Sequence, residues 1–420
     1  MARETHPLLK RLLGAVATPR VALLRAGVDR LQRELDEALR VRDAAVATSA
    51  AHERGKRQAL RAYNRYASAM RALDRYEHDS LTPGMPGWSE RWAEDRRRVL
   101  LFAPKDHAGS MVQWARAINA STEWAARAVS VTPHEFGYAT DLSYGVVEHL
   151  DHHLNRLLAE ADVIHVKDED GFRTGRNQLP ADSLSRHGKP MVFTLYGSVS
   201  RERQDERDYR AYVDTFDATA SLTPDLSFEW LRCPAFVGHA FDTEGTDVTW
   251  TDARSVGHSP SQPLVKATDA FMTAAERLRA ERGIEIDLIT GVSNRECVER
   301  KSRLGIFFDQ AGRNYGSGRV IGWYGNAGLE SAARGVPTIA HLSEQAFDRA
   351  ALGGADVRDA CGIMNTGTGT EAIYATMRDF FELDAAERAV CSKTTRAWVE
   401  SFHGFSAVGP RLESIYATLV

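Results

Sequence analysis

Cysteine is scarce in this chain. Its 420 residues include only four cysteines, and none forms a Cys-x-x-Cys pair or stands near histidine at a zinc-ligand spacing. This argues against a disulfide framework and a zinc site, and it fits a reducing compartment. Long hydrophobic runs are absent too, since none approaches the roughly 20 apolar residues of a membrane span. Charged residues also interrupt the N-terminal region, which therefore lacks the apolar core of a secretory signal. We expect a cytoplasmic protein that does not span a membrane.

A large excess of one charge is also lacking, because 53 basic side chains stand against 57 acidic ones. This balance gives no general reason to expect nucleic acid as a partner.

Residues 1–77, however, hold 16 lysines and arginines against 9 acidic residues. Within 21–77, apolar residues recur at steps of three and four, which is typical of paired helices. We predict a helical, coiled-coil-like extension and linker over 1–90, with 21–77 forming a homo-oligomer. Peripheral membrane contact through the basic amphipathic helix at 8–24 stays open.

Beyond the Pro/Gly-rich linker at 83–87, strand and helix patterns alternate along the chain. Such alternation predicts parallel, doubly wound sheets that bind ligands at the carboxyl ends of their strands. We expect an α/β fold with two Rossmann-like domains facing a cleft, at 98–245 and 250–385, and helices at 386–420 that pack back on the first domain. The expected strands are 99–103, 126–131, 161–166, 190–195, 218–221, 235–237, 255–258, 284–290, 305–309 and 338–340. The expected helices are 111–120, 146–159, 269–282, 294–304, 370–382 and 385–400.

A glycine-rich loop is the most informative local feature. Gly322–Glu330 reads Gly-Trp-Tyr-Gly-Asn-Ala-Gly-Leu-Glu and leads into an alanine-rich helix that ends at Gly335 before the strand Thr338–Ala340. Backbone N–H groups at the start of such a helix suit a phosphate. A carboxylate at Glu330 could accept hydrogen bonds from a ribose diol. A tight turn with a capped helix is the alternative interpretation.

Four segments, in this order and spacing, resemble retaining glycosyltransferases of family 4, which have the two-Rossmann GT-B architecture. They are 258–269, 291–296, 305–310 and 322–337. The resemblance runs from Arg98 to the C-terminus, and the Gly-Trp-Tyr-Gly loop is similar to that of a subgroup of these enzymes. It implies a glycosyltransferase that takes a nucleotide-sugar donor as substrate and needs no further cofactor.

The resemblance also implies roles for particular residues. Lys266 stands where the family's lysine contacts the donor diphosphate, and Glu330 stands where a glutamate holds the ribose. Tyr196 and Arg201 belong to a segment similar to His-Gly-Ser-x-x-Arg, and with Lys266 and Glu330 they form the expected catalytic set. The expected donor-binding residues are Gly109, Ser110, Ser259, Ser261, Val292, Gly325, Asn326 and Ala327.

The chain departs from the family's pattern at three places. Gly322 replaces the first glutamate of a Glu-x7-Glu pair, Tyr196 replaces a histidine, and Gln262-Pro263 stands where an arginine is usual. The first change implies either an altered sugar specificity, with Trp323, Asn326 or Asp309 taking over, or lost catalysis. At the third place, the hydrogen bonds that the arginine would donate would have to come from His258, Ser259 and Ser261.

In the expected mechanism the donor phosphate acts as base, so the anomeric configuration is retained and the protein positions substrates and stabilises charge. We expect no metal, because the acidic triplet 168–170 is not an Asp-x-Asp motif in the right setting. The acceptor stays open among a protein, a glycan, a lipid-linked sugar and a small metabolite. Replacing Lys266 or Glu330 by alanine should abolish transfer and leave the fold intact. Rival functions are a sugar-nucleotide epimerase, a phosphorylase, or a catalytically degenerate protein that binds or assembles through its helical arm.

Overall fold

The computed structural model describes Trp92, residues 94–132, 134, 136–139, 141–143, 154, 157–167, 184, 186–314 and 316–420. The predictions for 1–90 lie outside the described residues: the helical extension, the oligomer-forming segment 21–77 and the basic helix 8–24. The acidic triplet 168–170 and most of the helix expected at 146–159 lie outside them as well.

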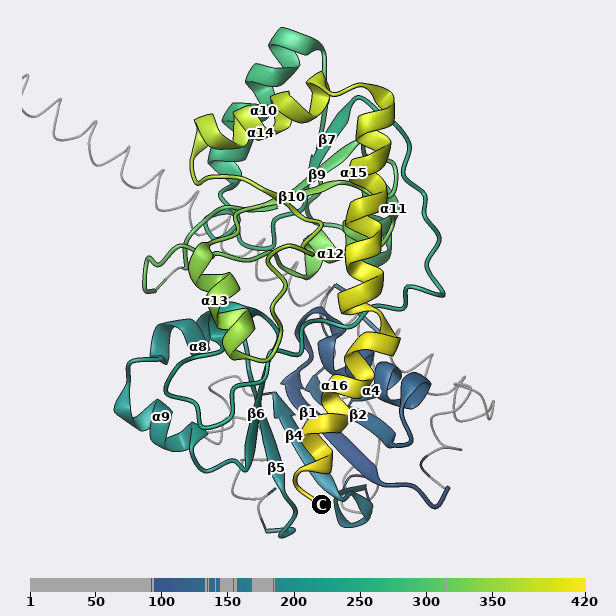
Figure 1. Ribbon diagram of the computed structural model, residues 1–420, viewed down its shortest axis with the longest axis vertical. Helices are drawn as coiled ribbons and strands as arrows, with labels where there is room; N and C mark the ends of the chain where they lie inside the picture. The colour runs from purple at the N-terminus through teal and green to yellow at the C-terminus, as the bar shows by residue number, and fades with distance from the viewer. Residues whose placement is uncertain are drawn as a thin grey trace, which may run out of the picture. The chain divides into compact units, whose positions relative to one another are not determined.

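The first sheet is entirely parallel and has six strands in the order β3-β2-β1-β4-β5-β6 (Figure 1). Every residue of β4 and β5 is buried, which is typical of central parallel strands covered by helices on both faces. The strands are β1 (Arg98–Lys105), β2 (Ala125–Thr132), β3 (Leu142–Ser143), β4 (Val163–Lys167), β5 (Met191–Leu195) and β6 (Ala218–Ser221).

The second sheet has five parallel strands in the order β11-β10-β9-β7-β8. Its central strands β7, β9 and β10 are buried throughout, whereas the edge strand β8 is exposed at both ends and half-buried between them. The strands are β7 (Ser255–His258), β8 (Glu285–Leu288), β9 (Ile306–Gln310), β10 (Thr338–Ala340) and β11 (Met364–Asn365).

The helices that flank the first sheet are α4 (Ser110–Ser121), α8 (Gly197–Arg203) and α9 (Arg207–Val213), with short 3-10 turns η1 (His107–Gly109) and η2 (Pro224–Leu226). The second half contributes α10 (Thr268–Arg282), α11 (Asn294–Lys301), α12 (Asn326–Ala332), α13 (Glu344–Leu352) and α14 (Thr370–Glu382). Serine side chains accept backbone N–H bonds at the starts of α11 and α13, as expected for N-cap residues.

Three helical segments end the chain: α15 (Ala385–Trp398), the π-helical turn η3 (Val399–His403) and α16 (Phe405–Ala417). An Asp384–Glu387 capping box starts α15. The last helix, α16, returns to the first sheet and lies beside α4 (Figure 1). Its Val408, Leu412 and Tyr416 belong to the same buried apolar cluster as strand β1.

The α/β architecture with two parallel sheets is confirmed, and the expected strand 338–340 and helix 370–382 have the predicted bounds. Most other bounds shift by one or two residues, and three elements are shorter than expected. The expected strand 235–237 is reduced to one bridge between Ser221 and Phe236. The helix expected over 294–304 ends at Lys301, because a turn then leads into β9. The strand expected over 284–290 is limited to Glu285–Leu288. No helix in the described part of the chain is both long and apolar enough to cross a membrane.

Candidate active site

A cavity of about 390 Å³ lies where the carboxyl ends of the two sheets meet. From the first half, the residues after β1, β5 and β6 line it, and from the second half those after β7, β8 and β9. Parallel α/β sheets bind ligands at this edge, because the loops there vary while the strands hold them rigidly. The cavity therefore occupies the position that the sequence predicts for a substrate.

The glycine loop forms one wall of this cavity. Tyr324, Gly325, Asn326 and Ala327 line it, and the rings of Trp323 and Tyr324 are each only 1% exposed. The Tyr324 hydroxyl bonds Nε2 of His403 at 2.9 Å and accepts from Nε1 of Trp398 at 3.0 Å. These contacts fix the backbone of the loop from behind.

Position 322 has no room for a side chain. A Cβ on Gly322 would lie 2.0 Å from Oγ of Ser343, far inside van der Waals contact. A glutamate, which the pattern of the similar glycosyltransferases has at this position, therefore cannot be introduced here without a backbone shift. Trp323, one candidate to take over its role, is 1% exposed and does not line the cavity.

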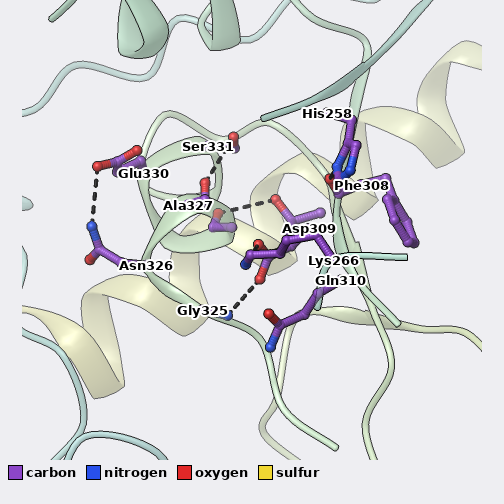
Figure 2. A network of polar contacts seen from close by, with 12 residues as sticks. His258, Lys266, Phe308, Asp309, Gln310, Gly325, Asn326, Ala327, Glu330 and Ser331 are labelled. Atoms are coloured by element: carbon purple, nitrogen blue, oxygen red, sulfur yellow. Dashed lines mark hydrogen bonds and ion pairs between the residues drawn. The ribbon is translucent and has the colours of Figure 1, made fainter. Parts of the chain in front are cut away.

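Glu330 is held from several sides. Its Oε1 accepts hydrogen bonds from Tyr138 Oη at 3.1 Å, Asn294 Nδ2 at 2.8 Å and Asn326 Nδ2 at 3.1 Å. Its Oε2 accepts from Lys301 Nζ at 2.6 Å. Figure 2 shows the contact with Asn326. The carboxylate is thus held in place at the cavity wall, where its oxygens accept hydrogen bonds. The two hydroxyl groups of a diol need such an acceptor.

Lys301 is almost completely buried, and its ammonium group contacts Glu330 and the carbonyl of Ala327. Burial by itself lowers the pKa of a lysine, but the adjacent Glu330 carboxylate outweighs this effect and the pKa of Lys301 is raised. Lys301 therefore keeps its proton and its positive charge at neutral pH. Nothing in the charged sequence Glu299-Arg-Lys301 indicates burial, so this residue could not be predicted from the sequence.

Lys266 precedes helix α10 and points its Nζ at Asp309, 2.7 Å from Oδ1 (Figure 2). The other carboxylate oxygen, Oδ2, accepts the backbone N–H of Gly325 at 2.5 Å. Asp309 is 1% exposed and does not line the cavity, whereas Lys266 does. Asp309 therefore joins the lysine to the glycine loop and acts on the cavity only through these two neighbours.

The start of helix α4 differs from the expected phosphate site. The carboxylate of Asp106 accepts from the backbone N–H groups of Met111 at 3.0 Å and Val112 at 3.1 Å, so it already occupies this N-terminus. The buried Lys167 contacts the same carboxylate and Oγ of Ser110. Gly109 and Ser110 are buried and do not line the cavity.

Tyr196 and Arg201 both line the cavity from helix α8 and the residue before it. The Tyr196 ring has Lys167 Nζ 4.1 Å from its centroid. The guanidinium of Arg201 is bonded to both carboxylate oxygens of Asp225. Burial raises the pKa of Asp225, but Arg201 more than offsets this, and the pKa is lowered overall. Arg201 therefore already has an anionic partner.

Of the remaining predicted donor-binding residues, Ser259, Ser261 and Val292 line the cavity. His258 does not, since its Nδ1 donates to the Phe308 carbonyl and its Nε2 bonds Thr268. His165 is likewise a core residue, bonded to Tyr416 and Thr194. Tyr138, His239 and Asn294 are among the further lining residues that were not predicted from the sequence. Of these three, Asn294 has a local signal, because it directly follows the N-cap Ser293.

No protein-family model matches the chain, and no curated protein sequence does. Two similar solved structures are of Anabaena Alr3699/HepE. The complex with UDP and glucose has a TM-score of 0.53 at 11% identity and covers 77% of this chain and 100% of that one. The complex with UDP-glucose has a TM-score of 0.50 at 11% identity and covers 76% of this chain and 100% of that one. Together with the two parallel sheets and the cavity between their carboxyl ends, this likeness shows the GT-B fold.

Proposed function

We propose that the protein is a glycosyltransferase that moves a sugar from a nucleotide-sugar donor to an acceptor hydroxyl. The observation that carries this proposal is the convergence of Lys266 and Glu330 on one cavity of a GT-B fold. A cation and a preoriented carboxylate suit the diphosphate and the ribose of a nucleotide sugar. HepE, which shares the fold, was solved with UDP and with UDP-glucose.

In the proposed reaction, Glu330 accepts hydrogen bonds from the ribose hydroxyls and Lys266 faces the diphosphate. As the glycosidic bond breaks, negative charge grows on the leaving phosphate, and a nearby ammonium group stabilises it. A phosphate oxygen of the donor takes the proton of the acceptor hydroxyl on the same face of the sugar, so the configuration is retained. Lys266 supplies the positive charge in this scheme, and we propose that the reaction is independent of metal ions.

A non-catalytic nucleotide-binding protein is the second candidate, because position 322 cannot hold the family's first glutamate.

Thermal-shift measurements with UDP-, GDP-, ADP- and TDP-sugars identify the donor, because a ligand that binds the folded state raises its melting temperature. Release of sugar or nucleotide from that donor then separates the candidates. An enzyme turns it over slowly even without the acceptor, whereas a binding protein raises its melting temperature without turnover.

Substitutions at the site complete this test. Lys266→Ala should remove turnover, and Lys393→Ala, at an exposed position of α15, is the matched control that should leave it unchanged. Equal turnover in the two variants contradicts the assignment of Lys266. If no nucleotide sugar shifts the melting temperature of the wild-type protein, the proposed function itself is wrong.

We also propose that residues 21–77 form a homo-oligomer, as their heptad-like pattern indicates. Light scattering on the full chain and on a form without residues 1–80 tests this. A lower number of subunits in the shortened form, with turnover retained, is the expected result. An unchanged number of subunits contradicts it.

A further inference from the structure

His403 lies in the segment that carries the chain from the second half back to the first. It is the last residue of the π-helical turn η3, and its side chain is buried. Helix α15 before this turn contacts α12 of the second half, whereas α16 after it contacts α4 of the first half. Turns of this kind are rare and occur frequently at functional sites. The imidazole of His403 is therefore placed to reach residues of both halves.

On one side, His403 is bonded to the loop that follows β6 in the first half. Its Nδ1 donates to the carbonyl of His239 at 2.7 Å, and its own carbonyl accepts from the N–H of Phe241 at 2.7 Å. A Cβ on Gly238, which has φ +82°, would lie 3.2 Å from Cε1 of His403, so this backbone approaches the imidazole closely. His239 lines the cavity. His403 therefore holds a wall of the cavity that the first half contributes.

On the other side, His403 is bonded to the glycine loop of the second half. Its Nε2 accepts from the hydroxyl of Tyr324 at 2.9 Å. Burial holds the pKa of His403 well below its ordinary value, so the ring is neutral at neutral pH. Because Nδ1 carries the one proton of this ring, Nε2 offers a lone pair to Tyr324. Tyr324 lines the cavity, and the imidazole thus joins one wall from each half.

The groups that we propose to hold the donor have supports of their own. The carboxylate of Asp309 binds both Nζ of Lys266 and the backbone N–H of Gly325. Glu330 is held by the four side-chain contacts described above. Loss of the His403 side chain should therefore leave these groups in place. It should change the position of the first-half wall relative to them.

We propose that His403 is a positioning residue that fixes the separation of the Tyr324 and His239 walls, and thereby the approach of the attacking hydroxyl to the donor sugar. This inference rests on the proposed function. A displacement of about 1 Å between reacting groups can lower a rate about 100-fold. Binding of the nucleoside diphosphate does not require that approach. His403 should consequently affect kcat much more than the affinity for the nucleotide.

Hydrolysis of a nucleotide sugar, in which water replaces the acceptor hydroxyl, tests this with the full chain. UDP-glucose, GDP-mannose, ADP-glucose and TDP-glucose are assayed in parallel, and kcat and KM are measured for the donor that wild type hydrolyses. Calorimetry gives the Kd of the corresponding nucleoside diphosphate. Tyr324→Phe removes only the bond to the second half, whereas His403→Phe removes both side-chain bonds. Both variants should lower kcat at least tenfold and change this Kd less than twofold.

Two further variants separate positioning from stability. His403→Gln keeps one donor and one acceptor, so it should recover part of the kcat that His403→Phe loses. His165→Gln is the matched control, because it also removes a buried histidine with two side-chain hydrogen bonds, but one that does not line the cavity. It should lower the melting temperature as His403→Phe does and leave kcat unchanged.

The other outcomes overturn the inference in distinguishable ways. Unchanged kcat in Tyr324→Phe and His403→Phe would assign His403 to the fold alone, and an equal loss in His165→Gln would attribute the effect to stability. Weakening of the nucleoside diphosphate in proportion to kcat would mean that His403 acts on the donor groups. If His403→Phe does not fold, Tyr324→Phe, which loses a single hydroxyl, decides. If wild type hydrolyses none of the four donors, the proposed function fails and this inference fails with it.

Discussion

The hydroxyl of Tyr138 donates to Oε1 of Glu330 at 3.1 Å, which joins two residues 192 positions apart. Asn294 and Asn326 donate to the same oxygen, and Lys301 binds the other one. A carboxylate oxygen has about two lone pairs, so a ribose hydroxyl must displace one of these donors. Tyr138 is the donor contributed by the opposite half of the chain.

Tyr138→Phe should therefore tighten nucleotide binding. Removing one competing hydrogen bond of roughly 1 kcal/mol should lower the dissociation constant about fivefold. Calorimetric titration of the variant with the nucleoside diphosphate that binds wild type measures the change. Phe136→Leu, at a lining residue of the same loop without a side-chain hydrogen bond to Glu330, is the matched control. Weaker binding in Tyr138→Phe would mean that the hydroxyl contacts the ligand.

The Lys301–Glu330 pair changes what substitutions at Glu330 should do. The sequence alone led us to expect an intact fold in Glu330→Ala, but that variant leaves the buried Lys301 without its carboxylate. Removing one member of a buried ion pair costs about 3–5 kcal/mol. Urea denaturation should show this loss in Glu330→Ala and in Lys301→Met, and a smaller loss in the double variant Lys301→Met with Glu330→Gln. Additive losses would show that the two side chains are not coupled.

Stability should fall as the pH drops below about 6.5. Burial lowers the pKa of His165 and His239 to about 3 and that of His258 to about 4. Between these values and the unfolded value near 6.5, the unfolded chain binds more protons, so acid favours unfolding. Each histidine contributes a slope of up to about 1.4 kcal/mol per pH unit in this window.

Urea denaturation at pH 7.5 and 5.5 measures this slope. His165→Gln should reduce the difference between the two pH values, whereas His187→Gln, which is partly exposed, should not. The same difference in wild type and His165→Gln would show that His165 titrates normally in the folded protein.

A methyl group at position 322 should destabilise the second domain. Gly322→Ala places a Cβ against Oγ of Ser343, and overpacking of this kind typically costs about 1–3 kcal/mol. Ser343 is also the N-cap of α13, where glycine costs only a few tenths of a kcal/mol. Adding Ser343→Gly to Gly322→Ala should therefore recover stability in urea denaturation. No recovery in the double variant would place the strain elsewhere.

The sequence was informative where a feature is local. Buried strands such as β4 and β5 are continuous apolar runs, and the helix 370–382 has a clear amphipathic period. Lys266 and Glu330 were found because each stands in a motif. Lys301 and His239 were not, because their burial depends on side chains that arrive from other elements. At α4 the sequence predicted a phosphate site that the structure does not have. The carboxylate of Asp106 accepts the N–H groups at the start of this helix, where a phosphate was expected.

The return of α16 to the first sheet has a consequence for the order of folding. Ser121 at the end of α4 donates to the carbonyl of Phe405, 284 positions later in the chain. During synthesis, the apolar face formed by β1 and α4 emerges from the ribosome long before the helix that covers it. Until then it exposes the surface that Val408, Leu412 and Tyr416 later bury, and chaperones recognise surfaces of this kind. The first domain reaches its final structure only after the second has been made.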